Sequence, residues 1–286
     1  MKIKEAYIQD KHYSKKEFDN FIASLVEKII EKYDKNKTSI IGIQGGQGTG
    51  KTTLVKYLKN ILDKLNYSSI SFSIDDFYKS YDERTSLAKK FKDNPFYQIA
   101  RGMPGTHRIE YLSEVFDKIK KGEKFKIPIF DKSLHDAAGD ISGEVKAEKR
   151  PDFVFFEGWI LGMPCIEPKE LLKICRNHDV DTSWFDVSDL KDMMNFCSGY
   201  ERLWDYLDMF IVLKAEELEL HYKWRYEQEV SLKKKKGKGM SKEEVYDFVK
   251  HYIPITLLIY QKAKPDLKLK IDKKHEFFEI VDYKNK

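Results

Sequence analysis

The spacing of apolar residues along the chain predicts an alternation of strands and helices. Five short apolar runs are typical of buried strands, and they lie at residues 39–44, 69–74, 153–156, 209–213 and 267–271. Helical spacing is clearest at residues 15–33, 51–65 and 215–262. Because strands that are separated by helical stretches form βαβ units, the pattern predicts an α/β fold with a parallel sheet and helices on both of its faces.

Two segments interrupt this alternation. Residues 175–200 are polar, irregular and rich in aspartate, and we expect them to form an insertion at the surface. Residues 233–239 contain a run of lysines that breaks the long helical pattern, which we interpret as a solvated loop between helices; contact with phosphate groups is the alternative. Ser241 followed by Glu244 is a capping box that restarts a helix. Pro254 should kink or end that helix.

Composition limits the class of protein. The chain has 286 residues, of which 41% are apolar and 35% charged, with a net charge of +5. These values fit one large domain over residues 1–286 and exclude wholesale disorder. The sequence contains no apolar run of 18 residues and no apolar stretch of signal-peptide length near residue 1, so we expect a cytoplasmic protein that does not enter a membrane. The spacing of Cys165, Cys175 and Cys197 is typical of neither a disulfide framework nor a zinc site, which predicts reduced thiols.

A glycine-rich segment carries the strongest chemical signal. Residues 45–52 satisfy the pattern GxxxxGK[ST] and lie between a predicted strand and a predicted helix, which is the context that a phosphate-binding loop requires. Its backbone amides should surround the phosphates, while Lys51 reaches the β- and γ-phosphates and Thr52 offers its hydroxyl to Mg²⁺. We therefore expect ATP and Mg²⁺ as ligands. The candidate nucleotide-binding residues are Gly45, Gly46, Gln47, Gly48, Thr49, Gly50, Lys51, Thr52 and Thr53.

Acidic residues at the ends of two predicted strands indicate which reaction the nucleotide serves. Asp75 and Asp76 follow the second strand, and Glu157 ends the third, where α/β sheets place their ligands. Phosphoryl transfer needs one acid near the metal and one near the acceptor hydroxyl, so we assign Glu157 to the metal and Asp75 to the acceptor. The sequence has neither the motif set of a protein kinase nor the NKxD that reads guanine, which leaves a small-molecule kinase as the favoured class.

Further motifs resemble a known family. The chain is similar to the plant-type D-glycerate 3-kinases and the related fungal ATP-dependent kinase-like proteins, within the larger group of uridine kinase, phosphoribulokinase and pantothenate kinase. The DxFY element at residues 75–78 is shared across that larger group, whereas the narrower RGMPGTH at 101–107 and FDKS at 130–133 are typical of the glycerate kinase branch. Other matching segments are FEGW at 156–159, GYERLW at 199–204, WRYEQE at 224–229 and GMS at 239–241.

The resemblance implies roles for individual residues. Asp75 is the implied catalytic base or hydroxyl-orienting carboxylate, assisted by Lys51, and Glu157 is the implied Mg²⁺ partner of Thr52. Arg225 lies where related kinases carry a catalytic arginine on a helical lid, here near residues 215–240; an ordinary helical ion pair with Glu229 is the alternative.

A small hydroxy acid such as D-glycerate would need a cationic clamp for its carboxylate, and Arg101, His107 and Lys132 are the candidates. A purely structural histidine at His107 and a solvated ion pair at Lys132 are the alternatives. Asp76 and Tyr78 of the DxFY element complete the candidate substrate-binding set. The family often carries an arginine after the Gly-Asp of this region, but here Ile141 follows Gly139 and Asp140, which weakens the assignment of D-glycerate.

Other functions remain open. The same scaffold serves kinases of nucleosides, pantothenate or sugar phosphates, and a P-loop regulatory or chaperone-like protein without transfer chemistry is a further alternative. The latter has little use for an acid at the acceptor position, which Asp75 supplies. Nucleic-acid binding through the lysine run lacks interleaved aromatic residues, so we expect a monomeric enzyme whose partner is a small-molecule hydroxyl acceptor.

Overall fold

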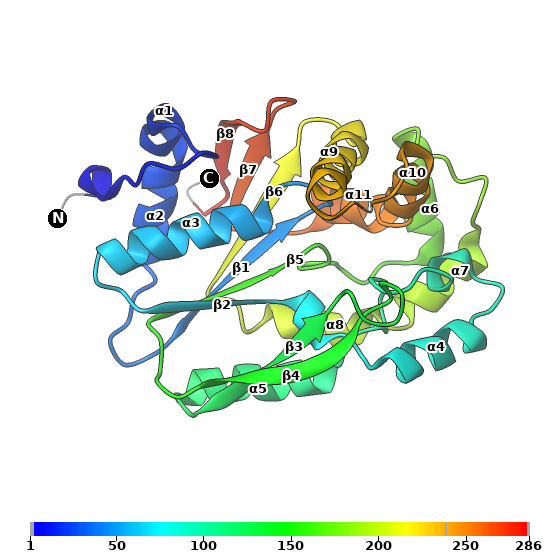
Figure 1. Cartoon of the computed structure of the whole chain (residues 1–286), viewed down its shortest axis with the longest axis horizontal. Helices are drawn as coiled ribbons and strands as arrows, with labels where there is room; N and C mark the ends of the chain where they lie inside the picture. The colour runs from blue at the N-terminus through cyan, green and yellow to red at the C-terminus, as the bar shows by residue number, and fades with distance from the viewer. Residues whose placement is uncertain (1–2, 238, 285–286) are drawn as a thin grey trace.

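A computed structural model describes residues 3–237 and 239–284 and places a six-stranded sheet at the centre of the molecule (Figure 1). The strand order is β2-β5-β1-β6-β7-β8, in which all neighbours are parallel except β7 and β8. The strands are β1 (Ser39–Gly45), β2 (Ser69–Ser73), β5 (Phe153–Gly158), β6 (Met209–Ala215), β7 (Leu267–Ile271) and β8 (Phe277–Asp282). Five of them coincide with the five predicted apolar runs, so the expected parallel sheet is confirmed.

Helices cover both faces of the sheet, as the pattern predicts, because successive strand residues point to opposite faces. Ile41 of β1 packs in one core with α2 (Ala23–Ile30) and α3 (Lys51–Lys64), whereas its neighbour Ile40 packs in a second core. That second core contains α5 (Ile109–Lys121), α6 (Pro168–Asn177) and α11 (Ile253–Lys262). In Figure 1, α3 and α5 lie on opposite sides of the sheet.

The remaining elements are short helices, two longer helices and a hairpin. Predicted residues 15–33 form α1 (Lys15–Glu17), a π-helical turn (Phe18–Ile22) and α2, with single-turn helices elsewhere at Ile3–Ala6, Ile74–Phe77 and Pro95–Tyr97.

Predicted residues 215–262 form α9 (Glu219–Lys236), α10 (Lys242–Lys250) and α11. The predicted cap at Ser241 is present, and Pro254 lies in the first turn of α11, where proline is tolerated, after the chain has already broken at the end of α10. Also present are α4 (Tyr81–Lys90) and the antiparallel pair β3 (Phe125–Asp131) and β4 (Asp140–Ala147), which the pattern did not predict.

Two expectations about residues 165–200 are wrong. The segment 175–200 is not an irregular surface insertion, because it forms α7 (Val187–Met194) and the start of α8 (Cys197–Trp204), and side chains such as Leu190 and Met193 are buried in the core. Cys165 and Cys197 are not reduced thiols but form a disulfide, with Cα atoms 5.4 Å apart. Their separation of 32 residues gives no local signal for this pairing, which arises because α8 packs beside the loop after β5. Cys175 is a buried free thiol, as expected.

The lysine run of 233–239 lies at the C-terminal end of α9. Lys233 and Lys234 belong to the helix and are exposed, which agrees with a solvated segment although the helix extends further than expected. Lys238 lies outside the described residues. No helix in the described part of the chain combines the length and the apolar character that a bilayer crossing needs.

Candidate active site

The phosphate-binding loop connects β1 to α3, as the sequence predicts. Gly45 is the last residue of β1 and Lys51 is the first of α3. Gly48 and Gly50 have φ angles of 77° and 84°, in the left-handed region that favours glycine. The Thr49 hydroxyl donates to the carbonyl of Gly46 at 2.9 Å. These contacts hold the loop in a turn that opens at the start of α3, where amides and the helix dipole favour anions.

Residues far along the chain cover this loop from the other side. His221 Nδ1 donates to the carbonyl of Gln47 at 2.8 Å, and His275 Nε2 donates to that of Gly48 at 2.7 Å. A Cβ atom at Gly46 would lie 2.4 Å from the His221 ring, and one at Gly48 would lie 2.6 Å from Cβ of Trp224. Gly46 and Gly48 therefore serve close packing against α9 as well as the turn itself. Sequence reasoning missed these covering residues, because nothing local connects them to the loop.

Lys51 lies at the centre of the loop with its ammonium group turned back onto it. Its Nζ atom donates to the carbonyls of Gly45 at 2.8 Å and Gly46 at 3.3 Å. Burial lowers the pKa of Lys51, while the nearby carboxylates of Glu157 and Asp75 oppose that shift. These two hydrogen bonds to carbonyl oxygens satisfy the buried ammonium group of Lys51. The group is positioned to bind phosphate oxygens in their place.

Thr52 and Glu157 meet at the adjoining strand end. The Thr52 hydroxyl donates to Glu157 Oε1 at 2.6 Å. Glu157 is buried in β5, where it is in register with Ile43 of β1 and Ser73 of β2. A hydroxyl and a carboxylate are the hard oxygen ligands that Mg²⁺ takes alongside nucleotide phosphates, so the donor set fits that ion.

Asp75 is held by two neighbours just beyond the end of β2. It accepts hydrogen bonds from Lys132 Nζ at 2.7 Å and from the Tyr78 hydroxyl at 3.0 Å. Burial alone would raise the pKa of Asp75, but the charge and hydrogen bond of Lys132 and the bond from Tyr78 outweigh it and lower the pKa. Lys132 comes from the end of the β3–β4 hairpin, so this unpredicted hairpin completes the site.

Asp76 has a different environment from Asp75. Its carboxylate accepts a hydrogen bond from the backbone amide of Ser73 at 2.8 Å, as the partner in a capping box. Burial raises the pKa of Asp76 to about 6, with a further contribution from the charge of Asp75. This side chain therefore helps to fix the turn that presents Asp75.

These groups line one cavity of about 840 Å³, which is within the range of small-ligand sites. Of the predicted residues, the cavity contacts Gln47, Gly48, Gly50, Lys51, Thr52, Thr53, Asp75, Asp76, Lys132 and Glu157. Gly45, Gly46 and Thr49 are buried in the loop beneath it. Lining residues that sequence reasoning missed are Lys56, Lys59, Asn60, Ser71, Phe72, Ser73, Val55, Gly158, Trp159 and Gln228. The FEGW motif already contained Trp159, and the WRYEQE motif contained Gln228.

The structure does not bring two of the predicted clamp residues into this cavity. The Arg101 guanidinium donates to the carbonyls of Ala137 at 2.5 Å and Ala138 at 3.0 Å, in the β3–β4 turn. His107 is 1% exposed, and its Nδ1 atom lies 2.7 Å from the Tyr200 hydroxyl. Burial lowers the pKa of His107 to about 3, so the ring is neutral and supplies no positive charge for a carboxylate. Both side chains hold loops around the site.

Tyr78 and Arg225 also lie outside the cavity lining. Tyr78 is buried, stacks on the His107 ring at 4.4 Å and reaches the site only through its bond to Asp75. Arg225 forms the alternative ion pair, with its Nη1 atom 2.5 Å from Glu229 Oε1, and lies over the ring of Phe248. In this structure, the α9 side chain that reaches the cavity is Gln228.

Comparisons with known proteins place the chain among small-molecule kinases. Residues 40–167 match the phosphoribulokinase/uridine kinase family. The chain is 36% identical to the uncharacterized kinase mug58 of Schizosaccharomyces pombe over 242 residues, which are 82% of this chain and 86% of that protein. It is 31% identical to the chloroplastic D-glycerate 3-kinase of Arabidopsis thaliana over 75% of this chain, but the match spans only 46% of that longer protein.

A solved structure extends the likeness to the whole fold. The D-glycerate 3-kinase from Cryptococcus neoformans var. grubii superposes with a TM-score of 0.81 at 25% identity, covering 94% of this chain and 98% of that one. The agreement includes the parallel sheet and the helices on both faces. The chain therefore belongs to the phosphoribulokinase/uridine kinase family of P-loop kinases, together with the D-glycerate 3-kinases and the related fungal ATP-dependent kinases.

Proposed function

We propose that this kinase transfers the γ-phosphoryl group of ATP to a hydroxyl group of D-glycerate. The observation that carries the proposal is the pairing of Asp75 with Lys132 at 2.7 Å, in the same cavity as Lys51 and Thr52. A carboxylate that can orient a hydroxyl and, beside it, an ammonium group that can pair with a substrate carboxylate are what a small hydroxy acid requires. The likeness to two D-glycerate 3-kinases supports this choice of acceptor.

Different residues of the site have separate roles in the transfer. Loop amides and Lys51 bind the phosphates, and Asp75 accepts the proton of the attacking hydroxyl as its oxygen bonds to phosphorus. The bond between the γ-phosphorus and the bridging oxygen breaks, and ADP leaves with that oxygen. Bound Mg²⁺ would neutralise charge on the phosphates, held by Thr52 and Glu157. Because Asp75 has a lowered pKa, its main contribution is to orient the hydroxyl rather than to act as a strong base.

A panel of acceptors tests this proposal. The full chain is incubated with labelled ATP and Mg²⁺ together with D-glycerate, L-glycerate, pantothenate, uridine or no acceptor, and labelled product is measured. We expect transfer to D-glycerate, and Asp75→Asn should reduce it by roughly 10²- to 10⁴-fold while ATP still raises the melting temperature. The matched change Asp82→Asn, at an exposed acid in α4, should have no effect. Transfer to pantothenate or uridine instead would reject D-glycerate, and turnover retained by Asp75→Asn would reject the role of that carboxylate.

The proposed metal ligands have a separate test. Thr52→Ala removes the hydroxyl that faces Glu157, so the variant should need a higher Mg²⁺ concentration for half-maximal activity at saturating ATP. Thr52→Ser keeps the hydroxyl and should restore the requirement of the unmodified protein. An unchanged Mg²⁺ requirement in Thr52→Ala would remove this residue from the proposed metal site.

A further inference from the structure

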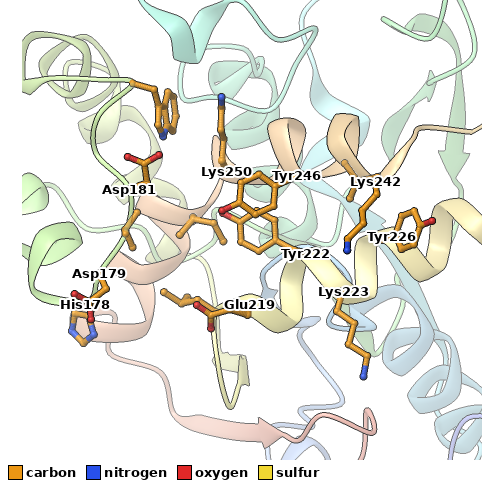
Figure 2. Close-up of a pocket in the computed structure, with 15 residues that line it drawn as sticks. His178, Asp179, Asp181, Glu219, Tyr222, Lys223, Tyr226, Lys242, Tyr246 and Lys250 are labelled. Atoms are coloured by element: carbon orange, nitrogen blue, oxygen red, sulfur yellow. The ribbon is translucent and has the colours of Figure 1, made fainter.

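A second cavity, of about 530 Å³, lies beside α9 (Figure 2). Its walls come from α9, α10, the first residue of α11 and the loop between α6 and α7. Its lining residues are His178, Asp179, Val180, Asp181, Trp184, Leu218, Glu219, Tyr222, Lys223, Tyr226, Lys242, Val245, Tyr246, Lys250 and Ile253. None of these residues lines the cavity beside the phosphate-binding loop. The two cavities are therefore separate sites.

Four of the residues that line this second cavity are aromatic: Trp184, Tyr222, Tyr226 and Tyr246. Tyr222 of α9 and Tyr246 of α10 stack with ring centroids 4.5 Å apart, and Tyr246 is 58% exposed. In Figure 2 this pair stands opposite the loop that carries Asp179 and Asp181. The stacked pair offers a flat surface to a flat ligand.

The lining of the cavity carries three carboxylates and three lysine ammonium groups, which differ in their ion pairs. Among the described residues, none forms an ion pair with Asp179, Asp181 or Glu219. In contrast, two of the three lining lysines already have acidic partners outside the cavity: Lys250 pairs with Asp247, and Lys223 Nζ lies 4.0 Å from Glu227. The three lining carboxylates therefore have no ion-pair partner in the described structure and can pair with a cationic ligand.

The carboxylates lie on one side of the tyrosine pair. Figure 2 shows Asp179, Asp181 and Glu219 on that side together with Lys250, and Lys223 and Lys242 on the opposite side. Burial raises the pKa of the Tyr222 hydroxyl, and the neighbouring Tyr246, Glu219 and Asp181 raise it further.

The same cavity already holds one cation against a ring. The ammonium of Lys250 lies 5.2 Å from the centroid of Trp184, within the range of a cation–π contact. Trp184 is partly buried against the core and cannot turn away freely. The aromatic wall of this cavity is thus suited to positive charge in its present arrangement.

We propose that this cavity is a second ligand site, which takes a small organic cation with a flat apolar body, such as an aromatic amine or amidine. The flat part packs on the stacked rings of Tyr222 and Tyr246, and the cationic group lies among Asp179, Asp181 and Glu219. Because α9 also carries His221 and Trp224 against the phosphate-binding loop, the site shares one helix with the nucleotide cavity.

Three flat molecules of matched shape but different charge test the proposal. Benzamidine is cationic, benzamide neutral and benzoate anionic, and the affinity of each for the full chain is measured by ligand-observed NMR titration without nucleotide. We expect benzamidine to bind more tightly than benzamide, and benzoate to bind most weakly. Tyr246→Ala should weaken benzamidine binding by roughly 2- to 13-fold, the range of an aromatic stacking contact. The pair Asp181→Asn and Glu219→Gln should remove the preference for benzamidine over benzamide.

Control variants separate this site from the nucleotide site and from general effects on folding. Tyr33→Ala removes another partly exposed tyrosine, which makes an edge-to-face contact with Tyr67 and does not line this cavity, and should leave benzamidine binding unchanged. Lys51→Ala, or an excess of ATP with Mg²⁺, should also leave it unchanged. The proposal is overturned if benzamidine fails to bind at millimolar concentration, if benzoate binds as well, if ATP competes with it, or if a Tyr246→Ala variant with an unaltered melting temperature binds it normally.

Discussion

Asp75 owes its ionised state to groups that come from distant parts of the chain. Lys132 is 57 residues away in sequence and half-exposed, yet its Nζ atom is the nearest positive charge to the carboxylate. Burial acts in the opposite direction on the pKa of Asp75, so the balance depends on this one cation. The acid is therefore ready to accept a hydroxyl hydrogen bond over a wide range of pH.

Removing Lys132 should shift this balance in a predictable direction. In Lys132→Met, burial is no longer opposed by the charge, so the pKa of Asp75 should rise. The acidic limb of the pH profile of kcat/KM, which reports the free enzyme, should then move to higher pH. Lys132→Arg keeps the charge and should leave the limb close to its original position. An acidic limb that stays in place in Lys132→Met would mean that another group controls it.

At the scale of elements, the parts of the fold with local patterns could be predicted and the parts held by distant contacts could not. The strands of the sheet and the loop at residues 45–52 have continuous apolar or glycine-rich patterns. The β3–β4 hairpin has no such pattern, because residues such as Ile129 and Val145 are exposed. Helix α7 was missed because a few buried residues within a polar segment are enough to dock it.

In the site, too, the features with a local sequence signal could be predicted and those held by distant contacts could not. The pairing of Thr52 with Glu157 could be expected, because both residues lie at strand ends or just beyond them in a parallel sheet. The placement of His107 could not, since its position depends on Tyr200, a partner 93 residues away. The contacts of His221 and His275 with the loop were unpredictable for the same reason.

Packing of α9 on the loop gives a prediction about glycines. Gly50→Ala places a side chain at φ 84° with open space around it and should destabilise the fold by roughly 1–2 kcal/mol. Gly48→Ala combines a similar backbone strain with a contact of 2.6 Å between the new Cβ atom and Trp224. The free energy of unfolding, measured in urea, should therefore fall further in Gly48→Ala than in Gly50→Ala. Gly199→Ala, inside α8 with its nearest neighbour at 3.7 Å, should be neutral or stabilising. If the two variants lose the same free energy of unfolding, α9 must shift to make room for the methyl group that Gly48→Ala adds.

At the scale of the whole molecule, buried histidines connect stability to pH. Burial lowers the pKa of His107 to about 3 and that of His221 to about 4, while an unfolded histidine titrates near 6.5. Between these values the unfolded chain binds more protons, so the free energy of unfolding should fall as the pH decreases below about 6.5. Asp76 acts in the opposite direction, because its folded pKa of about 6 exceeds the unfolded value and its protonation favours the folded state.

The three groups together predict a net loss of about 2 kcal/mol between pH 7 and pH 5, since the two histidines outweigh the single aspartate. Urea unfolding at the two pH values measures it. His107→Gln removes one histidine and should reduce the dependence without abolishing it, because burial also lowers the pKa values of His221, His251 and His275. His12→Gln, at an exposed position, should keep the full dependence. A stability that rises on acidification in the unmodified chain would contradict the sign, since it would require the folded state to bind the additional protons.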